Sequence, residues 1–431
     1  MKKEDFSSRA VALEILQAVL RKNQALDETM ATHKALSALE KRDRGFVHAL
    51  VACTLRRLGQ IDATLKACLE KPQEVKAPVM DILRLGAAQI LFLGTPSHAA
   101  VDTAVELAAA GNPTRPFKGL INAVLRRLTR EGEAMVKAQD AARLNTPDWL
   151  WLSWRQTFGT PVARDIATAH LGEALTDISV KSHPQEWAQK LGAKLLPTGS
   201  LRLDGSIPVQ ELEGFTEGEW WVQDAAAALP AKLLKEIGGH RVMDLCAAPG
   251  GKTLQLAARG ARVSAVDRSE KRLVRLRENL ERTGLEAAVF CADALTLKLG
   301  DKVHNVLLDA PCSATGTIRR HPDVQRLKKP EDVARMAMLQ ARLLEHVALD
   351  ILADGGTMVY AVCSLQPEEA EHQIENFLKN HAEFKRDPIA ASEVGGASEL
   401  ITSLGDVRCL PCHWPEHGGL DGFYAARLMK K

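Results

Sequence analysis

The spacing of apolar positions changes along the chain and divides its 431 residues into regions of different predicted structure. In residues 9–130 apolar side chains recur every three or four positions, as at Val11, Ile15, Ala18 and Val19. This period matches one face of an α-helix, and strand-like alternation is rare in the region. The pattern predicts an all-helical domain over residues 1–144.

A second region begins where Pro147 and a capping aspartate, Asp148, precede a tryptophan-rich stretch. Residues 145–238 are studded with glycine and proline and combine short helical patterns with brief alternating stretches such as residues 177–180. Short strands between turn-forming residues are typical of a small α+β module. We expect such a module between two larger domains.

From residue 239 to residue 431, short apolar runs alternate with helical patterns. The runs predict strands at residues 242–245 and 263–267 and strands ending at Asp293, Asp309 and Cys363; the helical patterns predict helices at residues 252–259, 270–283 and 331–352. Such alternation predicts an α/β fold with a mostly parallel sheet covered by helices on both faces.

The net charge of +2 conceals an asymmetry. Residues 1–130 hold 20 Lys and Arg against 13 Asp and Glu, whereas the remaining residues hold 36 against 41. A basic front half suits a phosphate backbone as partner, because neutralising phosphates releases condensed counterions. On charge alone, a solvated helical surface with a modest positive excess is the better explanation.

The chain carries no sign of export or of a membrane span. Apolar stretches stay short of the roughly 18 to 20 uncharged residues that a span needs, and no signal-peptide core follows the first residues. We therefore expect a cytoplasmic protein without membrane contact, whose 8 cysteines stay reduced. Cys409, Cys412 and His413 match a haem-attachment or half a zinc-site pattern, but no second ligand pair at zinc spacing accompanies them, and we expect no metal.

The turn after the first strand of the α/β region reads DLCAAPGGKT, at residues 244–253. Small residues there let the backbone approach a ligand, and the following helix offers free N–H groups to it. The spacing matches neither the dinucleotide nor the Walker pattern, so neither a dinucleotide nor ATP is favoured.

Aspartates close successive strands of the predicted sheet at Asp267, Asp293 and Asp309. Carboxylates at this edge accept hydrogen bonds from a ribose diol and attract a positive centre. S-adenosyl-L-methionine, a phosphate-free adenosine derivative with a sulfonium, suits this row. Taken singly, each aspartate is more simply a helix cap or a turn former.

Two cysteines follow apolar runs in the same way: Cys312 in LDAPCS and Cys363 in VYAVCS. Neighbouring strands lie about 4.8 Å apart, so both thiols are expected to face one pocket as a paired-thiol active site. The alternative is that both are small buried hydrophobic residues, the usual fate of a free cysteine.

Together these segments resemble the NOL1/NOP2/Sun family of RNA cytosine carbon-5 methyltransferases. The resemblance is carried by residues 244–253, 309–316 with 319–323, 360–364 with 367–369, and GLDGFY at 419–424. Residues 96–101 and 118–126 resemble the NusB-like RNA-binding domain of the bacterial members that act on small-subunit rRNA. The resemblance spans essentially the whole chain. It implies a Rossmann-like S-adenosylmethionine-dependent methyltransferase domain over residues 239–431 and methylation of carbon 5 of a specific cytosine in 16S rRNA.

Methylation at this carbon implies a covalent cysteine–cytosine adduct. Carbon 5 is a poor nucleophile until a thiolate adds at carbon 6 and turns the ring into an enamine. A second acid/base group then assists loss of the carbon-5 proton and expulsion of the thiolate. The resemblance implies Cys363 as nucleophile, Cys312 as the residue that assists release, and Asp309 as a hydrogen-bonding partner of the base or of the cofactor. The reverse assignment, with Cys312 as nucleophile as in DNA methyltransferases, stays open.

The resemblance also implies a set of cofactor-binding residues around the strand ends. These are Cys246, Ala247, Ala248, Pro249, Gly250, Gly251, Lys252, Asp267, Asp293 and Asp309. Lys252 is expected to orient the base or the methionine end of the cofactor. One position departs from the family pattern: Val362 stands where a threonine usually precedes the nucleophile, so a hydroxyl group is lost.

Basic residues follow the Cys312 motif, at Arg319, Arg320, Lys328 and Lys329. We expect this loop to bind RNA phosphates while a flipped cytosine enters the pocket. A solvated basic loop is the alternative for the two lysines, and it is less favoured for the arginine pair.

Two other functions stay open alongside 16S rRNA methylation by a monomeric enzyme. One is the same chemistry on tRNA or at another rRNA site. The other is a non-enzymatic RNA-binding ribosome-assembly factor with a silent methyltransferase half. Retention of both Cys312 and Cys363 argues against silence, because a dead site has no chemical need for the pair.

Overall fold

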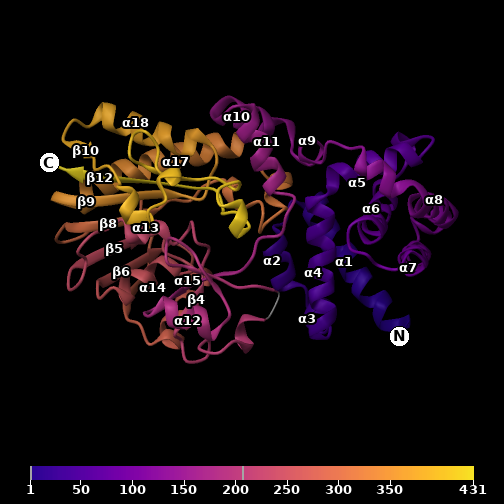
Figure 1. The fold of residues 1–431 in the computed structure, drawn as a ribbon, viewed down its shortest axis with the longest axis horizontal. Coiled ribbons are helices and arrows are strands. Elements are labelled where there is room, and N and C mark those ends of the chain that lie inside the picture. Colours follow the sequence, from indigo (N-terminus) through magenta and orange to yellow (C-terminus); the bar gives the residue numbers. More distant parts are fainter. Residues whose placement is uncertain (1, 206–207) are drawn as a thin grey trace. The chain divides into compact units, whose positions relative to one another are not determined.

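The computed structural model describes residues 2–205 and 208–431, which form two compact units (Figure 1). The first unit is Met1–Gly172 with Ile318–Lys328, and the second is Glu173–Thr317 with Lys329–Lys431. The boundaries expected at residues 144 and 238 differ from these: the first unit continues past residue 144 to Gly172, and residue 238 lies inside the second unit. A short segment of the region expected to be α/β belongs to the N-terminal unit.

The first unit is all-helical, as the apolar spacing predicts. It contains α1 (Lys2–Lys22), α2 (Leu26–Thr32), α3 (Lys34–Ser37), α4 (Lys41–Arg56), α5 (Leu58–Cys68), α6 (Ala77–Leu91), α7 (Ser97–Ala110), α8 (Lys118–Lys137), α9 (Ala141–Asn145), α10 (Asp148–Phe158), α11 (Thr160–Ala169) and α16 (Val324–Leu327). Val11, Ile15 and Val19 are buried together in its core, so the helical period marks the face that packs.

The segment Ile318–Lys328 is an integral part of this helical unit. The carboxylate of Asp323 accepts a hydrogen bond of 2.9 Å from the N–H of Leu26, at the start of α2. Arg56 in α4 donates to the carbonyl of Arg319 at 3.0 Å, and Leu327 packs against the helical core. Burial and hydrogen bonds to residues 297 and 263 positions earlier in the chain hold this segment in place.

The second unit opens with a small four-stranded sheet in the order β2-β3-β1-β4. Its elements are β1 (Asp177–Val180), α12 (Pro184–Lys190), β2 (Lys194–Leu195), β3 (Leu201–Arg202) and β4 (Trp220–Val222). The two oxygens of Asp177 accept hydrogen bonds of 2.6 and 2.7 Å from the guanidinium of Arg202, and both side chains are almost fully buried. Arg202 also donates to the carbonyls of His417 and Gly419. This ion pair therefore joins the small sheet to the loop that precedes the last strand.

A larger mixed sheet has the order β10-β12-β9-β8-β5-β6-β7, with β11 paired to β12. Its strands are β5 (Arg241–Leu245), β6 (Arg262–Asp267), β7 (Ala287–Cys291), β8 (Val303–Asp309), β9 (Leu352–Val362), β10 (Phe384–Arg386), β11 (Val407–Cys409) and β12 (Phe423–Lys430). Strands β5 to β9 are mutually parallel, and β12 runs antiparallel to β9. The chain progresses outward from β5 in both directions, so a crevice is expected beside its carboxyl end.

Helices cover both faces of this sheet (Figure 1). The helices α13 (Leu229–Lys232), α14 (Gly251–Ala258) and α15 (Glu270–Thr283) pack on one face, and α17 (Pro330–His346) and α18 (Glu371–Asn380) pack on the other. The predicted α/β architecture with a mostly parallel sheet is confirmed. Among the described residues, no helix is both long and apolar enough to cross a membrane.

Removing the carboxylate of Asp177 tests the ion pair that joins the small sheet to the C-terminal loop. Asp177→Ala leaves the guanidinium of Arg202 buried beside an empty site, and we expect this to cost about 3–5 kcal/mol of unfolding free energy. Urea unfolding followed by circular dichroism measures the loss. The matched control is Asp204→Ala, an exposed aspartate nearby, which we expect to change stability by no more than about 0.5 kcal/mol. Equal midpoints for the two variants would contradict this account.

Candidate active site

The turn after β5 is built for close approach of a ligand to the backbone. Cys246 takes a positive φ of 59° and Gly250 one of 107°, and α14 begins at the next residue. A side chain at position 250 would meet Leu276 at 2.8 Å, so glycine is required there. Asp244 in β5 accepts a hydrogen bond of 2.6 Å from the hydroxyl of Thr253 in α14, and this bond joins the two ends of the turn. Burial raises the pKa of Asp244 to about 7.

A pocket lies beside this turn at the carboxyl ends of β5, β6 and β7. Its lining includes Cys246, Asp267, Asp293, Pro311 and Leu339. Burial raises the pKa of the Cys246 thiol to about 12, so this cysteine is a neutral part of the wall. The pocket therefore combines apolar walls with carboxylates at its edge.

Asp267 ends β6, as predicted, and is held rigidly. One of its carboxylate oxygens accepts hydrogen bonds from the N–H of Ala248 at 3.1 Å and from Arg272 at 3.2 Å. The other accepts from the N–H of Ser269 at 2.9 Å. A carboxylate oxygen has room for two donors, so the second oxygen can still accept from a ligand hydroxyl.

Asp293 is placed differently from its predicted position at the end of a strand. Strand β7 ends at Cys291, and Asp293 follows in an exposed turn, where it accepts a hydrogen bond of 2.9 Å from the N–H of Leu295. It nevertheless lines the same pocket as Asp267. These two carboxylates and the N–H groups at the start of α14 form a donor and acceptor set that fits an adenosine with its ribose diol.

The two predicted cysteines lie together. Strands β8 and β9 are parallel neighbours with Asp309 opposite Ala361, and the cysteines follow just beyond their ends. The two sulfur atoms are 3.4 Å apart, and each residue is half-buried. The hydrogen bond with Cys363 and burial raise the pKa of the Cys312 thiol well above its usual value. At neutral pH Cys312 is therefore a neutral thiol.

An ion pair sits beside the thiols. The ammonium of Lys252 in α14 lies 2.8 Å from the carboxylate of Asp309, at the end of β8. It also lies over the ring of Phe423, 5.2 Å from the centroid. Burial alone would lower the pKa of Lys252, but the charge of Asp309 and the proximity of Cys363 outweigh it, so its pKa is raised. The ammonium of Lys252, held in place by Asp309, is thus a positively charged group near Cys363.

The structure corrects the expectation for Arg319, one of the four basic residues after the Cys312 motif. Arg319 is only 2% exposed, so its guanidinium is buried within the helical unit rather than presented to solvent. Buried His170 in the same unit has its pKa lowered to about 3, chiefly by desolvation and then by the charges of Arg319 and Arg56. Lys328 is half-buried and Lys329 is exposed.

Sequence reasoning missed a polar cluster directly behind the two cysteines. Ser313 and Ser364, the residues that follow each cysteine, both donate hydrogen bonds to the carboxylate of Glu369. The repeated Cys-Ser pair was the signal in the sequence, but nothing in the pattern pointed to a shared acceptor. Cys409 is buried in β11, and no three His, Cys, Asp or Glu side chains of the described residues could hold a metal ion together.

Comparisons with known proteins match both halves of the chain. Residues 231–429 match the model of 16S rRNA methyltransferase RsmB/F, and residues 7–130 match the NusB family. A ribosomal RNA small subunit methyltransferase B from Pseudomonas syringae pv. tomato is 36% identical, with 98% of this chain and 96% of the relative covered.

Two solved structures share the fold. The crystal structure of PH0851 has a TM-score of 0.76 at 23% identity and covers 100% of this chain and 99% of its own. A methyltransferase homolog from Pyrococcus horikoshii has a TM-score of 0.54 at 26% identity, with 71% of this chain and 98% of that chain covered. With its methyltransferase sheet, its helical NusB domain and a full-length relative above 30% identity, the chain belongs to the RsmB/F family of 16S rRNA methyltransferases.

Proposed function

We propose that this protein methylates carbon 5 of a cytosine in small-subunit ribosomal RNA, with S-adenosyl-L-methionine as methyl donor and a covalent adduct to Cys363. The observation that carries the proposal is the pair of thiols 3.4 Å apart beside the Lys252–Asp309 ion pair. The family name of the relatives supports the substrate, since they are ribosomal RNA small subunit methyltransferases.

The cofactor would lie in the pocket beside the turn of residues 246–252. Asp267 would accept from the ribose diol through its free acceptor position, and Asp293 would face the adenine end. The N–H groups at the start of α14 and the small residues Ala247 and Ala248 allow close approach of the backbone. Bound there, S-adenosyl-L-methionine supplies an electrophilic methyl group.

Cys363 begins the reaction by adding its thiolate to carbon 6 of the cytosine. A sulfur–carbon bond forms, and the ring's electron pair is displaced toward carbon 5, which becomes nucleophilic. The positive charge of Lys252 stabilises the thiolate before addition. Asp309 accepts a hydrogen bond from the exocyclic amine of the base and holds the ring in place.

Cys312 assists the return to the aromatic product. Once carbon 5 carries the methyl group, its proton must leave and the sulfur–carbon 6 bond must break, which returns the electron pair to Cys363. Cys312, 3.4 Å from the sulfur that departs, donates its proton to that sulfur, and the Cys312 thiolate so formed takes the proton from carbon 5.

Single alanine substitutions of the two cysteines separate their roles. Cys312→Ala is expected to accumulate a methylated protein–RNA adduct, because addition proceeds while release is impaired. Cys363→Ala is expected to form no adduct. The measurement uses small-subunit rRNA, tRNA as a parallel substrate, labelled S-adenosylmethionine and a denaturing gel.

Cys291→Ala is the control for loss of a thiol, since Cys291 is exposed at the edge strand β7, and it is expected to behave as wild type. The opposite result for the two site variants would make Cys312 the nucleophile. Methyl transfer only to tRNA would change the substrate, and transfer by no form would favour a non-enzymatic RNA-binding role.

Replacing Asp267 tests the cofactor pocket separately. Asp267→Asn removes a charged acceptor worth about 1.5–3 kcal/mol, so the Kd for S-adenosylhomocysteine is expected to rise about tenfold to a hundredfold. Isothermal titration calorimetry measures the change. The control Glu278→Gln removes a charge from the exposed face of α15 and is expected to bind as wild type. Unchanged affinity of Asp267→Asn would place the ribose elsewhere.

A further inference from the structure

One buried carboxylate connects the two loops that carry the cysteines. Glu369 lies in the turn η6 (Pro367–Glu369) after β9 and is 0% exposed. One of its oxygens accepts hydrogen bonds of 2.5 Å from both the Ser313 and the Ser364 hydroxyl groups. The other accepts from the N–H of Ser313 at 2.7 Å. Each serine directly follows one of the two cysteines. The carboxylate of Glu369 therefore binds both loops at the residue next to each cysteine.

A third element completes the ring of donors around Glu369. The side-chain amide of Gln340 in α17 donates to the carboxylate at 3.2 Å and to the carbonyl of Pro311 at 2.8 Å. The hydroxyl of Tyr360 in β9 donates to the backbone carbonyl of Glu369 at 2.7 Å. The carboxylate of Glu369 thus accepts four hydrogen bonds: from the two serine hydroxyls, the N–H of Ser313 and the amide of Gln340. A carboxylate can accept all four, whereas the NH₂ group of a glutamine side chain is a donor and cannot accept any.

The two loops have little freedom to separate. The N–H of Gly316 donates to the carbonyl of Cys363 at 3.0 Å, and the N–H of Leu365 donates to the Thr315 hydroxyl at 3.0 Å. A side chain at position 316 would meet the carbonyl of Gly422 at 1.9 Å. The distance between the cysteines thus depends on a packed set of polar contacts in which Glu369 is shared by both sides.

We propose that Glu369 is a positioning residue that sets the relative placement of the Cys312 and Cys363 sulfur atoms through Ser313 and Ser364. Its effect on turnover rests on the proposed function, in which the two sulfurs act at neighbouring ring atoms of one cytosine. Misplacement of a reacting group by about 1 Å can cost on the order of a hundredfold in rate. The negative charge of Glu369 has a second consequence, because it contributes to the raised pKa of the Cys312 thiol.

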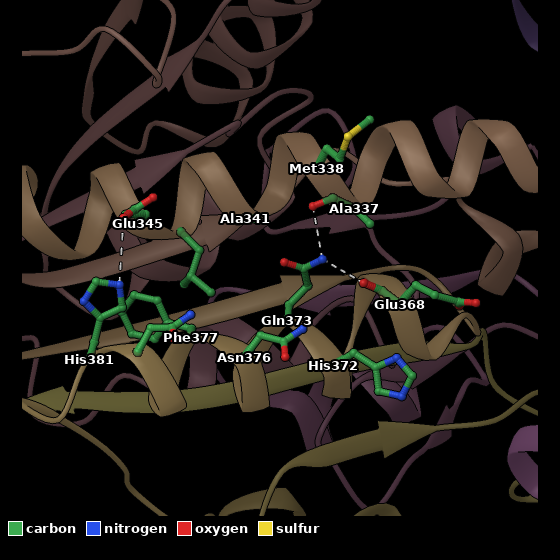
Figure 2. Close-up of a pocket in the computed structure, with 12 residues that line it drawn as sticks. Ala337, Met338, Ala341, Glu345, Glu368, His372, Gln373, Asn376, Phe377 and His381 are labelled. Carbon is green, nitrogen blue, oxygen red and sulfur yellow. Dashed lines mark hydrogen bonds and ion pairs between the residues drawn. The ribbon is translucent and has the colours of Figure 1, made fainter.

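The neighbouring glutamate provides a matched control. Glu368 has the same side chain, one position earlier in the same turn, but it lines the pocket between α17 and α18 (Figure 2). There its backbone carbonyl accepts a hydrogen bond of 2.7 Å from Gln373. Glu368→Gln removes one negative charge from the turn without touching the serines.

The first measurement needs no RNA and no cofactor. Alkylation of the protein by iodoacetamide across a range of pH, with the modified cysteines quantified by mass spectrometry, reports the reactivity of each thiol. In Glu369→Gln, loss of the anion and of the sulfur–sulfur contact both lower the pKa of Cys312. Its alkylation is therefore expected to begin at lower pH than in the wild type and in Glu368→Gln.

The second measurement is steady-state methylation of small-subunit rRNA. Glu369→Gln is expected to lower kcat about tenfold to a hundredfold while leaving the KM for RNA and for S-adenosylmethionine unchanged, because neither substrate touches Glu369. A general structural defect would raise KM and lower the thermal unfolding midpoint instead. Ser364→Ala, which keeps the charge and removes one donor, is the second variant if Glu369→Gln does not fold.

The outcomes separate this inference from the proposed function. A folded Glu369→Gln protein with the wild-type alkylation profile and the wild-type kcat would overturn the positioning role. If the wild type transfers no methyl group, the proposed function fails, and the alkylation profile alone decides whether Glu369 positions the thiols. Loss of kcat with a shifted profile, in the absence of either change for Glu368→Gln, supports the inference.

Discussion

The arrangement of the site depends on the parallel pairing of β8 with β9. Leu308 lies opposite Tyr360 and Asp309 opposite Ala361, and the N–H of Ala310 extends the pairing by donating to the carbonyl of Ala361 at 2.9 Å. Because both strands end at the same edge, the two cysteine loops leave side by side. A slip of one residue would turn every side chain of one strand to the other face, and the sulfur atoms would no longer meet. The register of β8 and β9 sets where the two cysteine loops begin. The contacts of Glu369 and the Lys252–Asp309 pair then fix the side chains within those loops.

Much of this geometry could be predicted from the sequence, since it follows from local periodicity. Alternation of apolar runs and helical patterns predicted the strands that end at Asp267 and Asp309, and parallel pairing places such ends at one edge. The end of β7 was predicted two residues late, because a turn-forming aspartate after an apolar run does not fix where pairing stops. The pocket still includes Asp293, so the error moved the strand boundary without removing this carboxylate from the pocket lining.

The features that could not be predicted depend on contacts between distant parts of the chain. Two adjacent arginines in a loop are typically exposed, yet Arg319 is buried because its segment packs in the helical unit, where its carbonyl is bound by Arg56. Glu368 and Glu369 are the same residue type in one short turn, and only the tertiary structure shows that one faces a groove and the other two buried serines. A charged side chain is buried only where hydrogen-bonding or oppositely charged partners surround it. Local sequence patterns do not identify partners that lie on other helices and strands.

The valine before the proposed nucleophile can be understood from the two faces of β9. Val362 is fully buried with Met358 and Tyr360 on the face covered by α17 and α18, whereas Cys363 packs with the cluster on the opposite face. A threonine hydroxyl at position 362 would therefore point into the apolar layer and away from the sulfur of Cys363. In the proposed mechanism the positive charge that stabilises the thiolate comes instead from Lys252, whose ammonium is held by Asp309 and interacts with Cys363. Loss of the hydroxyl at position 362 removes a group from the core, and it leaves the electrostatic environment of the proposed nucleophile intact.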